Sequence, residues 1–239
     1  RGLFAMLELP GIVRRVVIPI AYAVGRALGK YKKFSDAPAP VRSGPRPFHV
    51  PSRTSQATVL NVQVLLFDLG GVLVDYTGVR DIAPLLRVSA TENEIRRHFA
   101  GCPHVAAYCT GRLDRMQFGA RMVRDWGLTA STEQFLQEFR TWSRGLLPGA
   151  AELLSSLRPR FRLAALSNSN ELHWERHTND VGVTALFEVA ISSHQVGAAK
   201  PDPAIYQKAL ERLDVPPEAI MFFDDSHTNV VAASALGMR

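Results

Sequence analysis

The chain has 239 residues, of which 46% are hydrophobic and 21% charged, which is enough for one α/β core and a smaller module. No apolar run approaches the roughly 18 residues of a membrane span, which argues against an integral membrane protein. Cys102 and Cys109 are the only cysteines, too few for a disulfide framework or a zinc site. They favour a reducing, cytoplasmic location.

The positive charge is concentrated at the N-terminus. Residues 1–60 hold ten Lys or Arg and two acidic residues, giving +8, whereas residues 61–239 hold eighteen and twenty, giving −2. We therefore expect no nucleic-acid binding by the later part. Residues 1–60 are interpreted as a basic extension with a Pro/Ser-rich linker, left from a neighbouring domain or gene boundary. A membrane-associated regulator that uses this basic segment on an anionic surface is the less favoured alternative.

The first informative segment places an acid at the end of an apolar run. Val64 to Phe67 are apolar, Asp68 follows, and Gly70 and Gly71 come next. This pattern predicts a buried parallel strand that opens at the ligand-binding edge of an α/β sheet. Asp68 is then a candidate nucleophile, and the alternative is an ordinary turn-forming Asp.

About a hundred residues of helical character come next. Helix signals are the Thr91–Arg97 start, an amphipathic stretch from Met116 to Trp126 with Gly127 as a stop, and a start at Ser131 that runs to Trp142. We expect a helical cap over residues 80–144, inserted after the first core strand, with the core made of 61–79 and 145–239. Such a cap would exclude water and select the substrate.

Three later segments each place polar residues at an expected strand exit or turn. Leu163 to Leu166 lead to Ser167 and Asn168, where a hydroxyl and free N–H groups make a phosphate cradle. Lys200 lies in a turn-rich stretch before a helix that begins near Pro203, and its ammonium can neutralise phosphate charge. The strand Ile220 to Phe223 ends in Asp224 and Asp225, a pair that repels unless a hard cation such as Mg²⁺ lies between them.

The C-terminal stretch completes the pattern of alternating elements. Val230 to Leu236 predict a helix that ends at Gly237. A doubly wound sheet would normally continue into one more strand, so the chain is expected to be a fragment at this end as well as at Arg1.

These four motifs, in this order, resemble those of the haloacid dehalogenase-like hydrolase superfamily, in the subfamily with a helical cap between motifs one and two. The stretches Phe67 to Gly70 and Leu166 to His173 are similar to those of α-glucose-1-phosphate phosphatases. The resemblance covers roughly residues 61–239. It implies an α/β fold, with a doubly wound, Rossmann-like parallel sheet and the cap inserted after its first strand.

The resemblance also implies a Mg²⁺-dependent phosphatase that works through an aspartyl-phosphate, with a small phosphorylated metabolite as its partner. Asp68 would attack phosphorus, and the metal would be held by Asp68, the Gly70 carbonyl and Asp225, with Asp224 behind it or sharing the coordination. The phosphate would be bound by Ser167, Asn168 and Lys200, and Lys200 would bridge it to Asp68.

One position departs from the family's phosphatase motif, which carries a second Asp two residues after the nucleophile, where this chain has Gly70. Losing a positioned acid–base group costs about 10² to 10⁴ in rate. Asp75 or His173 can supply the proton instead, the substrate can have an acidic leaving oxygen such as a sugar C1 oxygen, or the protein no longer turns over. We expect the first or second, and hence a phosphatase for a small phosphomonoester, with a sugar phosphate favoured.

Two other functions remain as alternatives. The first is a non-catalytic, phosphate-sensing or interaction member of the same fold, which Gly70 favours. The second is a metal-independent haloacid dehalogenase-type hydrolase, which also uses a single nucleophilic Asp. The Asp224–Asp225 pair argues against the second function, because without a metal these two carboxylates would repel the anionic haloacid substrate and disfavour its binding.

Overall fold

A computed structural model describes residues 62–239, and the expected basic extension lies outside these residues. The chain divides into two units, Arg1–Val62 and Gln63–Arg239. The central sheet of the second unit has four parallel strands in the order β5-β4-β1-β6. The strands are β1 (Val64–Phe67), β4 (Arg162–Ser167), β5 (Val189–Ser192) and β6 (Ile220–Phe223).

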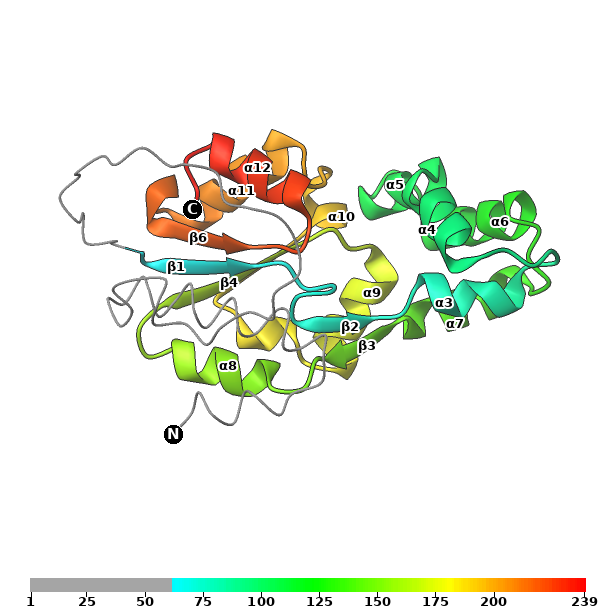
Figure 1. The fold of residues 1–239 in the computed structure, drawn as a ribbon, viewed down its shortest axis with the longest axis horizontal. Coiled ribbons are helices and arrows are strands. Elements are labelled where there is room, and N and C mark those ends of the chain that lie inside the picture. Colours follow the sequence, from blue (N-terminus) through cyan, green and yellow to red (C-terminus); the bar gives the residue numbers. More distant parts are fainter. Residues whose placement is uncertain (1–61) are drawn as a thin grey trace, which may run out of the picture. The chain divides into compact units, whose positions relative to one another are not determined.

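The strand at the centre is the one that carries the first motif. All four residues of β1 are buried, because strands on both sides and helices on both faces cover it. Figure 1 shows α11 (Pro203–Leu213) and α12 (His227–Ala235) over one face and α8 (Ala150–Leu157) over the other. The expected doubly wound α/β core is thereby confirmed.

The C-terminal helix is longer than the sequence pattern predicts. Helix α12 begins at His227 and not at Val230, and its polar first turn is fixed by tertiary contacts: the Tyr206 hydroxyl donates to the Asn229 carbonyl. Gly237 follows the helix with φ +94°, as a helix stop requires. Beyond it the backbone pairs alongside β6, with Arg239 bonded to Ile220 and Phe222.

A two-stranded antiparallel ribbon leads from the sheet to a group of helices. The ribbon consists of β2 (Val74–Tyr76) and β3 (Ser143–Leu146). Between its strands lie the cap helices, which are α3 (Val79–Ile82), a 3₁₀ turn (Ala83–Leu85), α4 (Glu92–Ala100), α5 (Pro103–Cys109), α6 (Arg115–Asp125) and α7 (Thr132–Thr141). This arrangement agrees with a helical insertion after the first core strand, and the exact domain limits stay a prediction.

The remaining elements lie between the later core strands. They are α9 (Glu171–Glu175), a π-helical turn (Arg176–Asp180), a 3₁₀ turn (Thr184–Leu186), α10 (Ser193–Val196) and a 3₁₀ turn (Pro217–Ala219). Of the described helices, none is long and apolar enough to cross a membrane.

Local capping explains where the cap helices begin. Thr91 and Glu94 form a reciprocal capping box at α4, and Ser131 forms another with Gln134 at α7. Helix α6 begins one residue before the expected Met116, because the Asp114 carboxylate accepts from the Gln117 N–H. The three main cap helices are thus defined by contacts within four residues of each start.

An aromatic cluster forms the interior of the cap. Phe118 lies at its centre: its ring stacks on Tyr108 with centroids 4.4 Å apart and lies 5.0 Å from Phe139. Phe135 and Trp142 complete the contacts around it. All five side chains are buried, so the cap has its own hydrophobic core.

We expect Phe118→Ala to lower the free energy of unfolding by about 3–5 kcal/mol, because it leaves a cavity in this cluster. The matched control is Met116→Ala on the same helix, since Met116 is 48% exposed and Phe118 is 0% exposed. Urea denaturation measures both. Equal effects of the two substitutions would contradict a packed cap interior.

Candidate active site

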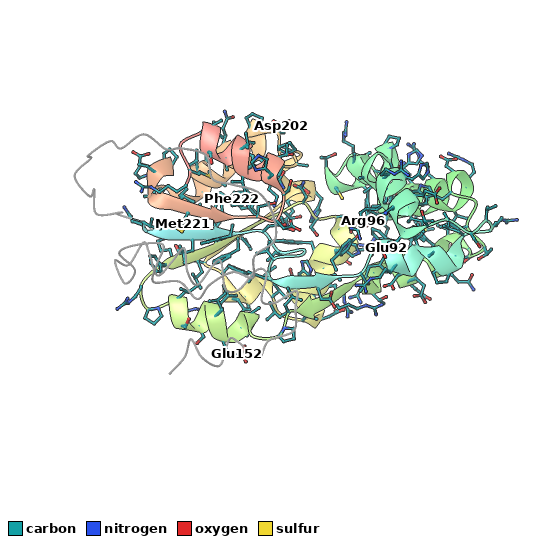
Figure 2. The ribbon with its side chains drawn as sticks, viewed as in Figure 1. Glu92, Arg96, Glu152, Asp202, Met221 and Phe222 are labelled. Carbon is teal, nitrogen blue, oxygen red and sulfur yellow. The ribbon has the colours of Figure 1, made fainter. Side chains whose placement is uncertain are left out.

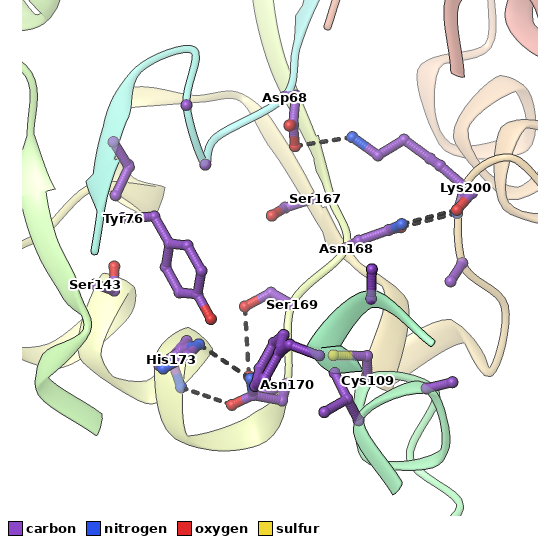
Figure 3. Close-up of a pocket in the computed structure, with 18 of the residues that line it drawn as sticks. Asp68, Tyr76, Cys109, Ser143, Ser167, Asn168, Ser169, Asn170, His173 and Lys200 are labelled. Carbon is purple, nitrogen blue, oxygen red and sulfur yellow. Dashed lines mark hydrogen bonds and ion pairs between the residues drawn. The ribbon is translucent and has the colours of Figure 1, made fainter. Parts of the chain in front are cut away.

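The carboxyl ends of three adjacent strands converge on one cavity. Asp68 directly follows β1, Ser167 is the last residue of β4, and Asp224 directly follows β6. Because β1 lies between β4 and β6 in a parallel sheet, these three residues reach the same edge. The cavity has a volume of about 630 Å³ and is lined by Asp68, Ser167, Asn168, Lys200 and Asp225, among others (Figure 3).

The Lys200 ammonium is the centre of the site. Its Nζ donates to Asp68 Oδ1 at 2.8 Å and to Asp224 Oδ2 at 2.7 Å. A third hydrogen bond goes to the carbonyl oxygen of Leu166 at 2.8 Å. The side chain is 1% exposed, so all three ammonium protons are used inside the protein. The Lys200 Nζ also lies 5.5 Å from the centroid of the Phe222 ring. Phe222 is labelled on β6 in Figure 2.

The Asn168 side chain holds the backbone of Lys200. Its Nδ2 donates to the Lys200 carbonyl oxygen, and its Oδ1 accepts from the Lys200 N–H, both at 2.8 Å. These two bonds join residues 32 positions apart in the chain. The sequence motifs assign Asn168 to phosphate binding only. Its contact with Lys200 was missed, because no local pattern in the sequence signals it.

A second asparagine, Asn229, orients Asp224. Its Nδ2 lies 3.0 and 3.1 Å from the two carboxylate oxygens of Asp224, and the Ser226 N–H donates to Oδ1 at 2.8 Å. With Lys200 on Oδ2, the Asp224 side chain is 0% exposed and fully hydrogen-bonded. Asn229 was also missed, although its position one turn into a helix after the acidic pair is a usable signal.

Asp225 differs from Asp224 in its surroundings. It is exposed and packs against Gly71, where a Cβ would lie 2.8 Å from Asp225 Oδ2. Gly71 also has φ +77°, which a side chain would strain. Partial desolvation of its carboxyl group, and then the neighbouring Asp224, raise the pKa of Asp225.

The three carboxylates form a group that can hold a cation. Ligand oxygens of Asp68, Asp224 and Asp225 all lie within 4.8 Å of one another. Oxygen donors at this spacing suit a hard divalent ion such as Mg²⁺. Gly70 lines the same cavity, and its metal role through a carbonyl stays a prediction.

The electrostatics of Asp68 combine opposing effects. Burial raises its pKa to about 6, the Lys200 ammonium acts to lower it, and Asp224 acts to raise it. Desolvation disfavours a lone buried carboxylate, so the adjacent ammonium is what keeps the ionised form accessible near neutral pH. This is the state that a nucleophilic carboxylate needs.

The two residues expected as proton donors are placed differently. Val74 and Tyr76 line the cavity and Asp75 between them does not, as the alternation of side chains along a strand requires. His173 does line it, but both of its ring nitrogens are engaged: Nε2 donates to the Phe139 carbonyl at 2.7 Å, and Nδ1 accepts from Asn170 Nδ2 at 3.0 Å. The geometry therefore favours neither residue as the donor.

A second buried histidine, His177, also lines the cavity. Its Nε2 lies 2.5 Å from the Ser143 hydroxyl oxygen, and its Nδ1 has no partner among the described residues. Burial lowers the pKa of both His173 and His177 to about 4. Both imidazoles are therefore neutral at physiological pH.

Contacts between the cap and the core close one side of the site. Arg115, at the start of α6, pairs with Glu171 and Glu175 of α9. The Ser193 hydroxyl donates to the Cys109 carbonyl. Gly111, with φ +69°, lies so near the His194 carbonyl that a Cβ would approach it to 2.6 Å. The cap loop is thus fixed against the core next to the cavity.

Such a site, a carboxylate paired with a buried lysine beside an acidic cluster at strand ends, is suited to nucleophilic transfer of a charged group. A model of the haloacid dehalogenase-like hydrolase family matches residues 62–237. The chain belongs to this family and is a hydrolase, as the sequence motifs predict.

Curated relatives agree with this assignment. The chain is 27% identical to Phosphatase MT3486 of Mycobacterium tuberculosis, over 75% of this chain and 86% of that protein. It is 26% identical to a phosphorylated carbohydrates phosphatase of Thermotoga maritima, over 74% and 83%. A shorter match, 31% identical over 46% of this chain and 50% of the relative, is to Protein CbbY of Rhodobacter capsulatus.

Solved structures share the fold. An enzyme of this family from Bacteroides thetaiotaomicron, bt-2542, in complex with magnesium and inorganic phosphate, has a TM-score of 0.63 and 24% identity, covering 74% of this chain and 91% of that one. The L-2-haloacid dehalogenase PA0810 has a TM-score of 0.55 and 23% identity, covering 74% and 82%. These likenesses show that the chain shares the fold of both proteins.

The buried histidines predict how stability depends on pH. Their folded pKa, about 4, is below the unfolded value near 6.5, so their contribution is complete above pH 6.5 and is lost as the pH falls toward 4. Each imidazole should cost about 2 kcal/mol of stability between pH 7 and pH 5. Asp68, with its raised pKa, takes up a proton in the folded state over this interval and offsets part of the loss.

A comparison of two proteins isolates the histidine effect. We expect the stability of His177→Gln to fall by about 2 kcal/mol less than that of the unmodified protein between pH 7 and pH 5. Chemical denaturation at both pH values measures the difference. Identical pH dependence of the two proteins would show that His177 is not held neutral by burial.

Proposed function

We propose that this chain is a Mg²⁺-dependent phosphatase that hydrolyses small phosphomonoesters through an aspartyl-phosphate on Asp68. The observation that carries the proposal is the Asp68 carboxylate, 2.8 Å from a fully buried Lys200 ammonium and within 4.8 Å of two further carboxylates. A nucleophile in this setting can approach a dianionic group only if positive charge is present, and Lys200 together with a bound cation would provide it. The names of the curated phosphatase relatives support the same reaction.

The reaction divides into two displacements. A carboxylate oxygen of Asp68 forms a bond to phosphorus as the ester P–O bond breaks, and the leaving oxygen departs as an anion that takes a proton from solvent. Water then forms a new bond to phosphorus and gives up a proton to solvent, the Asp68–phosphorus bond breaks, and the carboxylate is regenerated with inorganic phosphate as the product. Ser167, at the end of β4, lines the cavity beside Asp68, so its hydroxyl and the Asn168 N–H are our proposed phosphate ligands.

The acidic cluster fits a divalent cation. Asp68, Asp225 and the Gly70 carbonyl would hold it, with Asp224 behind them because its oxygens are taken by Lys200 and Asn229. When bound, Mg²⁺ supplies charge neutralisation for carboxylate and phosphate. Lys200 holds the Asp68 and Asp224 carboxylates, Asn229 bonds Asp224 as well, and Asn168 holds the Lys200 backbone.

Gly70 stands where the family's phosphatase motif carries an acid–base Asp, so its presence limits which leaving groups the site can release. Asp75 does not line the cavity, and both ring nitrogens of His173 are hydrogen-bonded. Burial raises the pKa of the Cys109 thiol to about 11. Neither of the two residues expected as proton donors, nor the Cys109 thiol, is therefore placed to protonate the leaving oxygen. This favours substrates whose leaving oxygen is acidic enough to depart unaided, as in a sugar 1-phosphate. The relative named for phosphorylated carbohydrates is compatible with that class.

A panel of phosphomonoesters, assayed with and without Mg²⁺, tests the function. We expect hydrolysis that requires Mg²⁺, rises with the acidity of the leaving oxygen, and falls by at least about 10³ in Asp68→Asn, which keeps the shape but removes the nucleophilic charge. Phosphate release measures the rate. Halide release from a 2-haloacid without added metal, with no phosphate released from any ester, would instead establish the dehalogenase alternative.

The adjacent glycines provide a matched pair that tests the metal site. Gly71→Ala introduces a Cβ 2.8 Å from Asp225 Oδ2 at a positive φ, whereas a Cβ at Gly70 meets no atom within 4 Å and keeps the carbonyl. We expect Gly71→Ala to weaken Mg²⁺ activation by roughly tenfold or more, since a shift of about 1.4 kcal/mol suffices. Gly70→Ala should change it much less. Mg²⁺ titration of activity compares them, and the reverse order would refute the role of Asp225.

A further inference from the structure

Three aromatic rings form a continuous stack from the cap interior to the cavity. The Phe139 ring is buried in the cap cluster, and the His173 imidazole stacks on it at 4.4 Å with an interplanar angle of 25°. The Tyr76 ring meets His173 edge to face, at 5.5 Å and 76°. The exposed fraction of the residue rises along the stack, from 1% for Phe139 through 5% for His173 to 39% for Tyr76. Only its last member presents substantial surface to solvent.

His173 is fixed more firmly than a surface histidine. Its backbone N–H donates to Asn170 Oδ1, its Nδ1 accepts from the Asn170 amide, and its Nε2 donates to the Phe139 carbonyl. Burial lowers its pKa to about 4, so it stays a neutral aromatic ring. His173 therefore acts as a rigid support for Tyr76, which explains a buried histidine in the cavity with no free nitrogen.

The Tyr76 ring stands in the cavity and the local backbone makes room for it. Figure 3 shows the ring projecting from its strand into the space between His173 and Ser167. A Cβ on Gly78 would lie 2.5 Å from this ring, so glycine at that position allows the ring to adopt its place. Within the described part of the chain, the Tyr76 hydroxyl makes no hydrogen bond. The position of the ring is therefore defined by its edge-to-face contact with His173 and by the space left at Gly78.

We propose that Tyr76 is a specificity residue: its ring is the platform against which the non-phosphate part of the substrate packs, and it selects leaving groups with a flat apolar ring face. This inference rests on the proposed phosphatase function, and it names a substrate class for that site. A large exposed aromatic ring in the cavity is stabilised when another apolar face covers it.

The rest of the cavity is compatible with such a group. On the cap side it is lined by apolar residues from α4 and α5, namely Phe99, Ala100, Val105 and Ala106. A volume of about 630 Å³ is within the range of small-molecule sites and holds a phosphate together with a six-membered ring. The ring face can come from a pyranose or from an aryl group, which share the same stacking chemistry.

The experiment compares KM values for three phosphate esters in two variants. The esters are ethyl phosphate, which has no ring, a hexopyranose phosphate and phenyl phosphate. Tyr76→Leu keeps an apolar side chain but removes the ring, and Tyr76→Phe keeps the ring but removes the hydroxyl. Each variant is referred to the unmodified protein for each ester, so differences in leaving-group reactivity cancel. Met116→Leu, exposed on α6, is the matched control outside the cavity.

In Tyr76→Leu we expect the KM for a ring-bearing ester, relative to that for ethyl phosphate, to rise roughly tenfold, as the loss of an aromatic stacking contact allows. In Tyr76→Phe this ratio should stay within about twofold of that of the unmodified protein. A rise confined to the hexopyranose ester identifies a sugar as the occupant, and one confined to phenyl phosphate identifies an aryl group. Equal ratios in all proteins, or equal shifts in the Leu and Phe variants, would overturn the proposal.

A binding measurement separates this inference from the function on which it rests. Calorimetric titration of the same esters, with Mg²⁺ present, into Asp68→Asn and into Asp68→Asn combined with Tyr76→Leu reports affinity without turnover. If Tyr76→Leu abolishes ring-dependent binding but the unmodified protein hydrolyses no ester, the phosphatase function is refuted and the platform is upheld. If binding does not depend on a ring but the unmodified protein is an active phosphatase, the platform is refuted and the phosphatase function is upheld.

Discussion

The structure of the site depends on one buried ammonium shared by two carboxylates. Lys200 uses all three of its protons inside the protein, on Asp68, Asp224 and the Leu166 carbonyl. Removing one partner of such a buried charge group leaves the others uncompensated, at a cost of about 3–5 kcal/mol. The balance of burial against the ammonium is also what brings the pKa of Asp68 to about 6. Stability and nucleophilicity therefore depend on the same three-residue group.

Two asparagines make this arrangement rigid from opposite sides. Asn168 holds the Lys200 backbone with two hydrogen bonds, and Asn229 bonds both oxygens of Asp224. Neither carries charge, so they position the charged groups without altering the net charge of the site. The result is preorganisation: the ammonium and the carboxylates of Asp68 and Asp224 are held in place by hydrogen bonds within the protein.

Much of the fold can be predicted from local sequence patterns. The apolar run before Asp68 becomes a fully buried central strand, and the capping boxes at Thr91 and Ser131 start helices where expected. The family assignment and the doubly wound sheet are confirmed for the same reason: the motifs recur at strand exits in a fixed order. Helix α12 was expected three residues late, since its polar first turn is held by Tyr206, a contact that periodicity does not contain.

The sequence by itself determined the strands, the helix starts and the identity of the charged groups, because these depend on side-chain periodicity and on contacts within about four residues. Only the tertiary structure decided how those groups are used. In the folded chain both ring nitrogens of His173 are hydrogen-bonded, Asp75 does not line the cavity, and Asn168 bonds the backbone of Lys200. Two of these contacts, Asn168 with Lys200 and His173 with Phe139, join residues more than thirty positions apart in the chain. Whether a donor is free or occupied is therefore settled only when the chain folds.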